Sequence, residues 1–157
     1  MNIGVTGHQR IPDEARAYVE RGLDEFLRGY DGADVTGLSS MAYGADQLFA
    51  DAMLRAGHPV TAIIPCRGYR ATFTGEGLAA YDRLMEQVRT AVTLDFPEPG
   101  EDAYLAAGKR VVDESDILVA FWDGLPAAGK GGTGDAVAYA KARRKRVVVI
   151  WPEGVRH

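Results

Sequence analysis

The segment SDILVAFWDG, residues 115–124, decides the fold predicted for this chain. Its apolar part, Ile117 to Trp122, has the length of a strand and carries no charge, which is typical of a parallel strand buried on both faces. A glycine-rich segment, Gly129 to Asp135, follows it, and a helix is predicted from Gly132 to Arg143. A strand, a glycine-rich loop and a helix in this order form one unit of a parallel α/β sheet.

The same alternation extends over the whole chain. It predicts strands at residues 2–6, 35–38, 60–64, 92–96, 117–122 and 147–151, and helices at residues 12–28, 44–55, 78–88, 101–113 and 132–143. Residues 66–77 show no clear period and are predicted to form a loop or lid. We therefore predict an α/β fold, a single Rossmann-like doubly wound sheet of about six mostly parallel strands with helices on both faces, as one domain over residues 1–157.

The expected strand order predicts where a ligand would bind. The two most apolar runs, residues 117–121 and 147–150, are expected to be buried near the centre of the sheet. We place residues 117–122 beside residues 2–6, so that the strand order reverses between them. Ligands of doubly wound sheets bind at such a reversal.

Composition and charge exclude several classes of protein. Hydrophobic residues make up 46% of the chain and charged residues 25%, which are ordinary globular values. The net charge of −4 argues against nucleic acid as the main partner, because such binding needs many Lys and Arg contacts to phosphates. The single cysteine, Cys66, excludes an internal disulfide, and the three scattered histidines predict no metal site. With no apolar run of ~20 residues and no signal peptide, we expect a cytoplasmic protein without a membrane partner.

The first candidate binding element is Gly4-Val5-Thr6-Gly7-His8, which follows the first apolar run. At a strand-to-helix turn, unpaired N–H groups and the positive helix end favour an anion, most often a phosphate. The Thr6 hydroxyl and the Arg10 guanidinium would add contacts to a phosphate or ribose, with His8 within reach. The alternative is a plain turn into the helix that begins at Pro12.

The second element joins a predicted strand end to a helix start over residues 36–46. Asp46 can cap the helix, which stabilises it by roughly 1 kcal/mol, or accept hydrogen bonds from a ligand hydroxyl. We expect Ser39, Ser40 and Gly44 to face the cleft more directly than Asp46.

The third element is the most specific, because a buried strand ends in it and four glycines precede a helix. Glycines let phosphate oxygens approach the backbone, and a threonine at the start of the helix can cap it while offering its hydroxyl. The residues expected to bind a nucleotide here are Asp123, Gly124, Lys130, Gly131, Gly132 and Thr133.

These motifs resemble the SLOG superfamily of Rossmann-like nucleotide binders. The matching segments are GVTGH, SSMAYGADQLFADAML, and SDILVAFWDG followed by GKGGTGDAVAYA. The superfamily includes the cytokinin-activating LOG phosphoribohydrolases, often described as lysine decarboxylase-like, and the Rossmann domain of the DNA-processing protein DprA. The resemblance covers nearly the whole chain and implies a nucleotide, AMP-like or ADP-ribose-like, at these loops.

The chain departs from the LOG pattern where catalysis is concerned. LOG enzymes carry a Pro-Gly-Gly-x-Gly-Thr loop followed by paired acids, and an arginine before the preceding strand. Here the proline is absent, the acidic pair becomes Asp135-Ala136, and Asp113 takes the arginine position. We therefore favour a sensor or carrier of a nucleotide-derived ligand, with no further cofactor assigned. A phosphoribohydrolase using Asp135 as acid or base, and a protein-interaction module or homo-oligomer built on the same scaffold, remain open.

Overall fold

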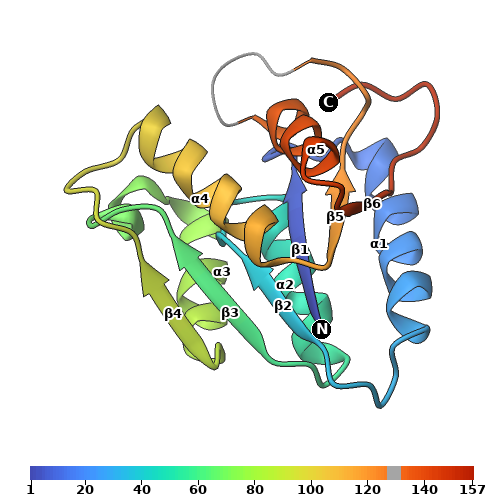
Figure 1. Cartoon of the computed structure of the whole chain (residues 1–157), viewed down its shortest axis with the longest axis horizontal. Coiled ribbons are helices and arrows are strands. Elements are labelled where there is room, and N and C mark those ends of the chain that lie inside the picture. Colours follow the sequence, from blue (N-terminus) through green and yellow to red (C-terminus); the bar gives the residue numbers. More distant parts are fainter. Residues whose placement is uncertain (127–131) are drawn as a thin grey trace.

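The computed structural model describes residues 1–126 and 132–157 (Figure 1). Its strands are β1 (Asn2–Gly7), β2 (Thr36–Ser39), β3 (Val60–Ile64), β4 (Thr90–Thr93), β5 (Ile117–Phe121) and β6 (Arg146–Val149). Its helices are α1 (Asp13–Arg28), α2 (Ala45–Arg55), α3 (Gly75–Met85), α4 (Glu101–Glu114) and α5 (Thr133–Ala142), with a short 3₁₀ turn at Tyr69–Thr72. In the part of the chain described, no helix has the length and apolar character needed to cross a membrane.

All six strands are parallel and lie in the order β4-β3-β2-β1-β5-β6. The chain builds outward from β1 through β2, β3 and β4, then returns through α4 to place β5 on the other side of β1. Ile3 pairs with Ile117 and Gly7 with Phe121, so β1 and β5 are in contact along their whole lengths. The strand order therefore reverses between β1 and β5, as predicted.

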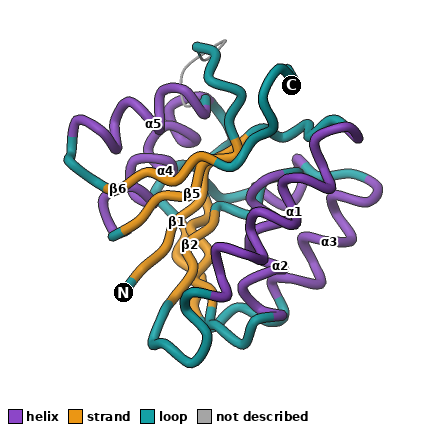
Figure 2. The backbone as a smooth tube through the Cα atoms, turned by 90° about the vertical axis from the view of Figure 1, so that its right-hand side faces the viewer, coloured by secondary structure: helices purple, strands orange, loops and turns teal. Residues whose placement is uncertain are grey.

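The helices cover both faces of the sheet, as Figures 1 and 2 show. Helices α1, α2 and α3 pack on one face, and α4 and α5 pack on the other. Strand β5 is buried throughout because it lies between β1 and β6 with helices above and below. The predicted doubly wound α/β fold is confirmed.

Three local predictions are wrong. Residues 147–150 were expected near the sheet centre, but β6 is an edge strand, and Val149 is 49% exposed. Gly4 to Gly7 are not a turn; they are strand residues of β1, and the turn begins at His8. The segment 66–77, predicted to be a loop or lid, contains the 3₁₀ turn, and α3 begins at Gly75 instead of Leu78.

Candidate functional site

A cleft of about 1120 Å³ lies at the carboxyl edge of the sheet, over the β1–β5 reversal. Because all strands are parallel, the segments that follow β1, β2, β3 and β5 meet at this edge, and α4 forms one wall. Among the described residues predicted to bind, those that line the cleft are Thr6, Gly7, His8, Arg10, Ser40, Asp46, Gly132 and Thr133. Segments more than 120 positions apart in the sequence thus contribute to one cleft.

The other predicted residues have different positions. Among the described residues, the cleft lining does not include Ser39, Gly44, Asp123, Gly124 or Asp135. Lys130 and Gly131 lie outside the described residues. Asp135 is exposed on α5, so the structure lends no support to its use as a catalytic acid in this cleft.

The glycines of β1 serve close packing. A Cβ on Gly4 would collide with the Ser115 hydroxyl and lie 2.8 Å from Val111 Cγ1, so Gly4 lets α4 approach the sheet. A Cβ on Gly7 would collide with Ala45 at the start of α2 and lie 3.0 Å from Phe121 Cβ. Their spacing therefore reflects contact between strand and helices as well as proximity to the cleft.

The β2–α2 segment places the Asp46 carboxyl in the cleft. Asp46 does not cap α2: the helix has no side-chain cap, and Asp46 Oδ2 accepts a hydrogen bond from the Ala42 N–H at 3.3 Å. Ser39, expected to face the cleft, is buried instead; its hydroxyl donates to the Asp46 carbonyl and accepts from the Met41 N–H. Burial raises the pKa of Asp46 to about 7, against the smaller opposing effect of the Ala42 hydrogen bond.

Gly44 has a structural role in the same segment. Its φ of +90° lies in the region that favours glycine, and a Cβ there would meet the backbone of Gln9 and His8. The Ala45 N–H donates to the His8 carbonyl at 3.1 Å. The expectation that Gly44 faces the cleft is wrong, because Gly44 instead lets the start of α2 press against the turn after β1.

The amino end of α5 contributes Gly132 and Thr133 to the cleft. Gly132 is the N-cap, and no side chain caps the helix, so the predicted capping role of Thr133 is wrong. The first-turn N–H groups of α5 therefore have no side-chain acceptor from the described residues, and the helix end carries partial positive charge. Such an end favours an anion.

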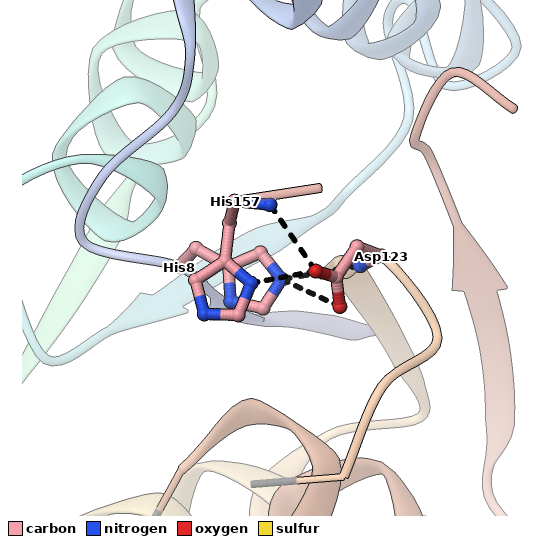
Figure 3. Close-up of side chains that lie close together, drawn as sticks. All are labelled: His8, Asp123 and His157. Carbon is pink, nitrogen blue, oxygen red and sulfur yellow. Dashed lines mark hydrogen bonds and ion pairs between the residues drawn. The ribbon is translucent and has the colours of Figure 1, made fainter. Parts of the chain in front are cut away.

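A cluster that the sequence analysis did not predict joins the two ends of the chain. His8, Asp123 and His157 meet beside the cleft (Figure 3), with the His157 Nδ1 atom 2.6 Å and its backbone N–H 3.2 Å from Asp123 Oδ2. The Asp123 N–H donates to His8 Nε2 at 3.1 Å, and the rings of His8 and His157 stack with centroids 3.6 Å apart. No spacing in the sequence signals this contact, since it depends on where the segment after β6 returns.

The hydrogen bonds of this cluster keep Asp123 ionised. Burial raises the pKa of Asp123, but hydrogen bonds from His157 and Leu125, with a smaller effect of His8, outweigh it and hold the pKa at about 2. Burial, and secondly His157, lower the pKa of His8 against the opposing effect of Asp123. Asp123 is therefore a carboxylate at neutral pH, and the His157 Nδ1 atom carries the proton between them.

The same three residues offer ligand atoms within 4.8 Å of one another, the range of a metal site. However, the two imidazole planes are nearly parallel, at 5°, so one ion cannot lie in both ring planes as imidazole ligands require. A metal ion would also have to displace the Asp123 N–H from His8 Nε2. In this structure, hydrogen bonds to Asp123 and stacking on the His8 ring hold His157 beside the cleft.

Aromatic side chains from the segment after β3 and from α4 line one part of the cleft. Tyr69, Phe73 and Tyr104 belong to the lining, and Tyr69 lies 5.0 Å from Phe73 and 6.3 Å from Tyr104 between ring centroids. Local sequence does not indicate that these three side chains share one wall, because residues 66–77 lack a period and Tyr104 lies on a different element.

Solved structures with the same fold come from several kinds of protein. The DNA-processing protein A (DprA) of Streptococcus pneumoniae is 14% identical with a TM-score of 0.71, and the match covers 94% of this chain and 49% of that protein. DprA of Helicobacter pylori, described in a single-stranded DNA binding mode, is 16% identical with a TM-score of 0.68, covering 95% and 64%. The molybdenum cofactor carrier protein of Chlamydomonas reinhardtii is 15% identical with a TM-score of 0.57, covering 94% and 74%.

These likenesses establish the fold. This chain spans about half of the S. pneumoniae protein and less than two thirds of the H. pylori protein. Neither protein-family models nor the sequences of curated proteins gave a match. The fold is the one that the resemblance to the SLOG superfamily implied.

Proposed function

We propose that the cleft binds a small phosphorylated ligand derived from a nucleotide, and that the protein acts as its sensor or carrier. The observation that carries the proposal is the meeting of two anion-binding features at the strand reversal. The uncapped amino end of α5 and the side chains of Thr6 and Arg10 line one cleft. The carrier of a molybdenum cofactor among the similar structures is consistent with a small-molecule role for this fold.

The charges around the cleft support an anionic ligand at the β1–β5 end. Arg10 is exposed and makes no ion pair within residues 1–126 and 132–157. Thr133 is 8% exposed and is the first residue of α5, whose amino end has no side-chain cap. A phosphate there would accept hydrogen bonds from backbone and hydroxyl groups and a charge-assisted bond from the guanidinium.

A thermal-shift screen against AMP, ADP, ATP, cyclic nucleotides, NAD and ADP-ribose tests the proposal. A ligand at 100 times its dissociation constant stabilises the fold by about 2.7 kcal/mol, which raises the melting temperature by several degrees.

Arg10→Ala and Thr133→Val should each weaken binding about tenfold or more, because each removes a contact to the anion. Arg28→Ala is the matched control, since Arg28 is exposed at the far end of α1. If no compound at millimolar concentration shifts the melting curve, the proposal is wrong.

Two further assays separate this proposal from its alternatives. A sensor or carrier returns its ligand unchanged, so chromatography after long incubation with nucleoside monophosphates should show no free base. Base release would replace the proposal with N-glycosidic hydrolysis. An electrophoretic shift of single-stranded DNA at physiological salt would indicate nucleic-acid binding, against which the net charge of −4 argues.

A further inference from the structure

We propose that Asp46 recognises the ribose of the ligand, its carboxyl group pairing with the two hydroxyls of the vicinal 2′,3′-diol. The ligand class is then a ribonucleoside 5′-phosphate with its phosphate toward α5 and its base toward Tyr69 and Tyr104. This inference rests on the proposed function, which it makes more specific.

The order of the strands arranges three kinds of chemistry in a row along the carboxyl edge. The segments after β5 and β1 supply the anion-binding groups, the segment after β2 supplies Asp46, and the segment after β3 supplies Tyr69 and Phe73. Because the sheet order is β3-β2-β1-β5, the carboxyl group stands between the aromatic wall and the anion site. A nucleoside phosphate has the same order of parts, in which the ribose joins the base to the phosphate.

The contacts of Asp46 leave Oδ1 for a ligand, and a carboxylate oxygen can accept two hydrogen bonds, one from each hydroxyl of the diol. Oδ2 accepts the Ala42 N–H, whereas Oδ1 takes part in no hydrogen bond within the described residues. In the same part of the chain, Asp46 forms no ion pair with Lys, Arg or His. A half-buried carboxyl group without a cation is unfavourable unless something donates hydrogen bonds to it, and a ligand in the cleft can do so.

The protonation of Asp46 favours hydroxyl groups over a cationic group. With a pKa near 7, the carboxyl group is present in both forms at neutral pH. A ligand ammonium needs the ionised form, whereas a hydroxyl can donate to the carboxylate or accept from the acid. A vicinal diol presents two such hydroxyls, and carboxylates pair with ribose hydroxyls in dinucleotide-binding folds.

The loop before Asp46 contains two residues with positive φ angles. Met41 is fully buried with a φ of +62°, and Gly44 follows at +90°. A positive φ is strained in a non-glycine residue and persists where the surroundings enforce it. The Ser39 hydroxyl provides that enforcement by bonding both the Met41 N–H and the Asp46 carbonyl. The carboxyl group is thus held in position before a ligand arrives.

Calorimetric titration with paired ligands tests the inference. The probes are AMP, GMP, CMP and UMP, each compared with its 2′,3′-dideoxy counterpart, on the wild type, Asp46→Ala and Asp46→Asn. In the wild type, the ribonucleotide that binds should do so about tenfold or more tightly than its dideoxy form, as expected for hydrogen bonds to a charged group. In Asp46→Ala the ratio should fall to about one. Asp51→Ala on the same helix is the matched control and should keep the wild-type ratio, since Asp51 pairs with Arg55 and Arg83 outside the cleft.

The outcomes distinguish this inference from the proposed function. If a ribonucleotide binds the wild type but the dideoxy form binds equally well, or the ratio survives in Asp46→Ala, the inference is overturned and the proposed function stands. If no nucleotide binds the wild type, both are overturned. Should Asp46→Ala fail to fold by circular dichroism, Asp46→Asn decides, because its amide oxygen can keep the Ala42 contact; its ratio should lie below that of the wild type.

Discussion

At the scale of single residues, Asp46 lowers the stability of the folded state when it is ionised, and it lies in the cleft. Its carboxyl group receives one backbone hydrogen bond and no cation within the described residues, so burial dominates its ionisation. A group of this kind is common where a protein binds or transforms a ligand, since it is kept despite its effect on stability. That effect can be measured without knowing the ligand.

Asp46→Asn should stabilise the protein at high pH. The folded state raises the pKa of Asp46 from 3.8 to about 7, so the folded state holds the proton more tightly than the unfolded state. The stability contributed by Asp46 is therefore full below pH 4 and is lost as the pH rises through 7. Asparagine resembles the neutral acid, so the variant should gain about 1–3 kcal/mol over the wild type at pH 8 and nothing at pH 4. Urea unfolding at both pH values measures this, with Asp24→Asn on the exposed face of α1 as the control. A constant difference between pH 4 and 8 would contradict the assignment.

Asp123→Asn should have the opposite pH dependence. The folded state lowers the pKa of Asp123 to about 2, so its stabilising effect is present above pH 4 and is lost as the pH falls through 2. Near pH 7 the variant should lose about 1–3 kcal/mol, because a buried carboxylate with three donors becomes an amide. Denaturant unfolding across pH 2 to 7 follows the change.

His157→Ala separates the contribution of the ring from that of the carboxylate. This variant keeps the Leu125 and backbone donors to Asp123, so it should lose less stability than Asp123→Asn. An Asp123→Asn curve that matches the wild type at pH 7 would show that the cluster contributes no stability.

These two aspartates show which residue roles a sequence can predict. Asp46 was a candidate because it follows a predicted strand and lies at the start of a predicted helix. Whether it caps the helix or contacts a ligand depends on whether its side chain turns back along the helix or into the cleft. Backbone dihedrals at Met41 and Gly44 decide that, and no local pattern encodes them. Asp123 was predicted to touch the ligand, but its partner is His157, 34 positions away. Contacts of this range depend on tertiary structure.

At the scale of elements, the glycines of β1 set how closely the helices approach the sheet. Gly4→Ala should destabilise the protein by about 1–3 kcal/mol, because the added methyl would collide with the Ser115 hydroxyl, which is held by the Val111 carbonyl. Gly108→Ala on α4 is the matched comparison, since a Cβ there meets nothing within 4 Å. It should stabilise the helix by up to about 1 kcal/mol through helix propensity. Thermal unfolding of both variants measures the two effects, and equal effects of the same sign would refute the packing role of Gly4.

The same glycines explain why motif spacing misplaced the first loop. A Gly-x-x-Gly pattern after an apolar run fits both a phosphate turn and a strand pressed between helices, since both need backbone without a side chain. Periodicity predicted the strand at residues 2–6 nearly correctly, and pairing with Phe121 extended it to Gly7. The neighbouring strand, which local sequence does not reveal, decided between the two interpretations.

At the scale of the whole molecule, the alternation of strands and helices was sufficient to predict the fold and the reversal beside β1. Hydrophobicity alone failed for β6, because its run of valines is typical of a central strand. In the structure α5 and β5 cover only part of it, and among residues 1–126 and 132–157 no strand pairs with its outer edge. The position of the cleft followed correctly from topology, because parallel strands bring all their carboxyl ends to one edge.

Hydrogen exchange tests that consequence of topology directly. A ligand that binds as proposed should slow amide exchange in segments distant in sequence but adjacent at this edge, namely residues 6–10, 40–46, 69–76 and 132–136. The turns at the opposite edge, residues 29–34 and 56–59, should exchange at unchanged rates, and they serve as the internal control. Mass spectrometry of peptides from the protein with and without a saturating nucleotide resolves these segments. The two edges are separated by the full length of the strands, so slowed exchange confined to the opposite edge would require a different binding site. Slowed exchange at residues 132–136 without residues 6–10 would mean that the ligand does not bridge the β1–β5 reversal.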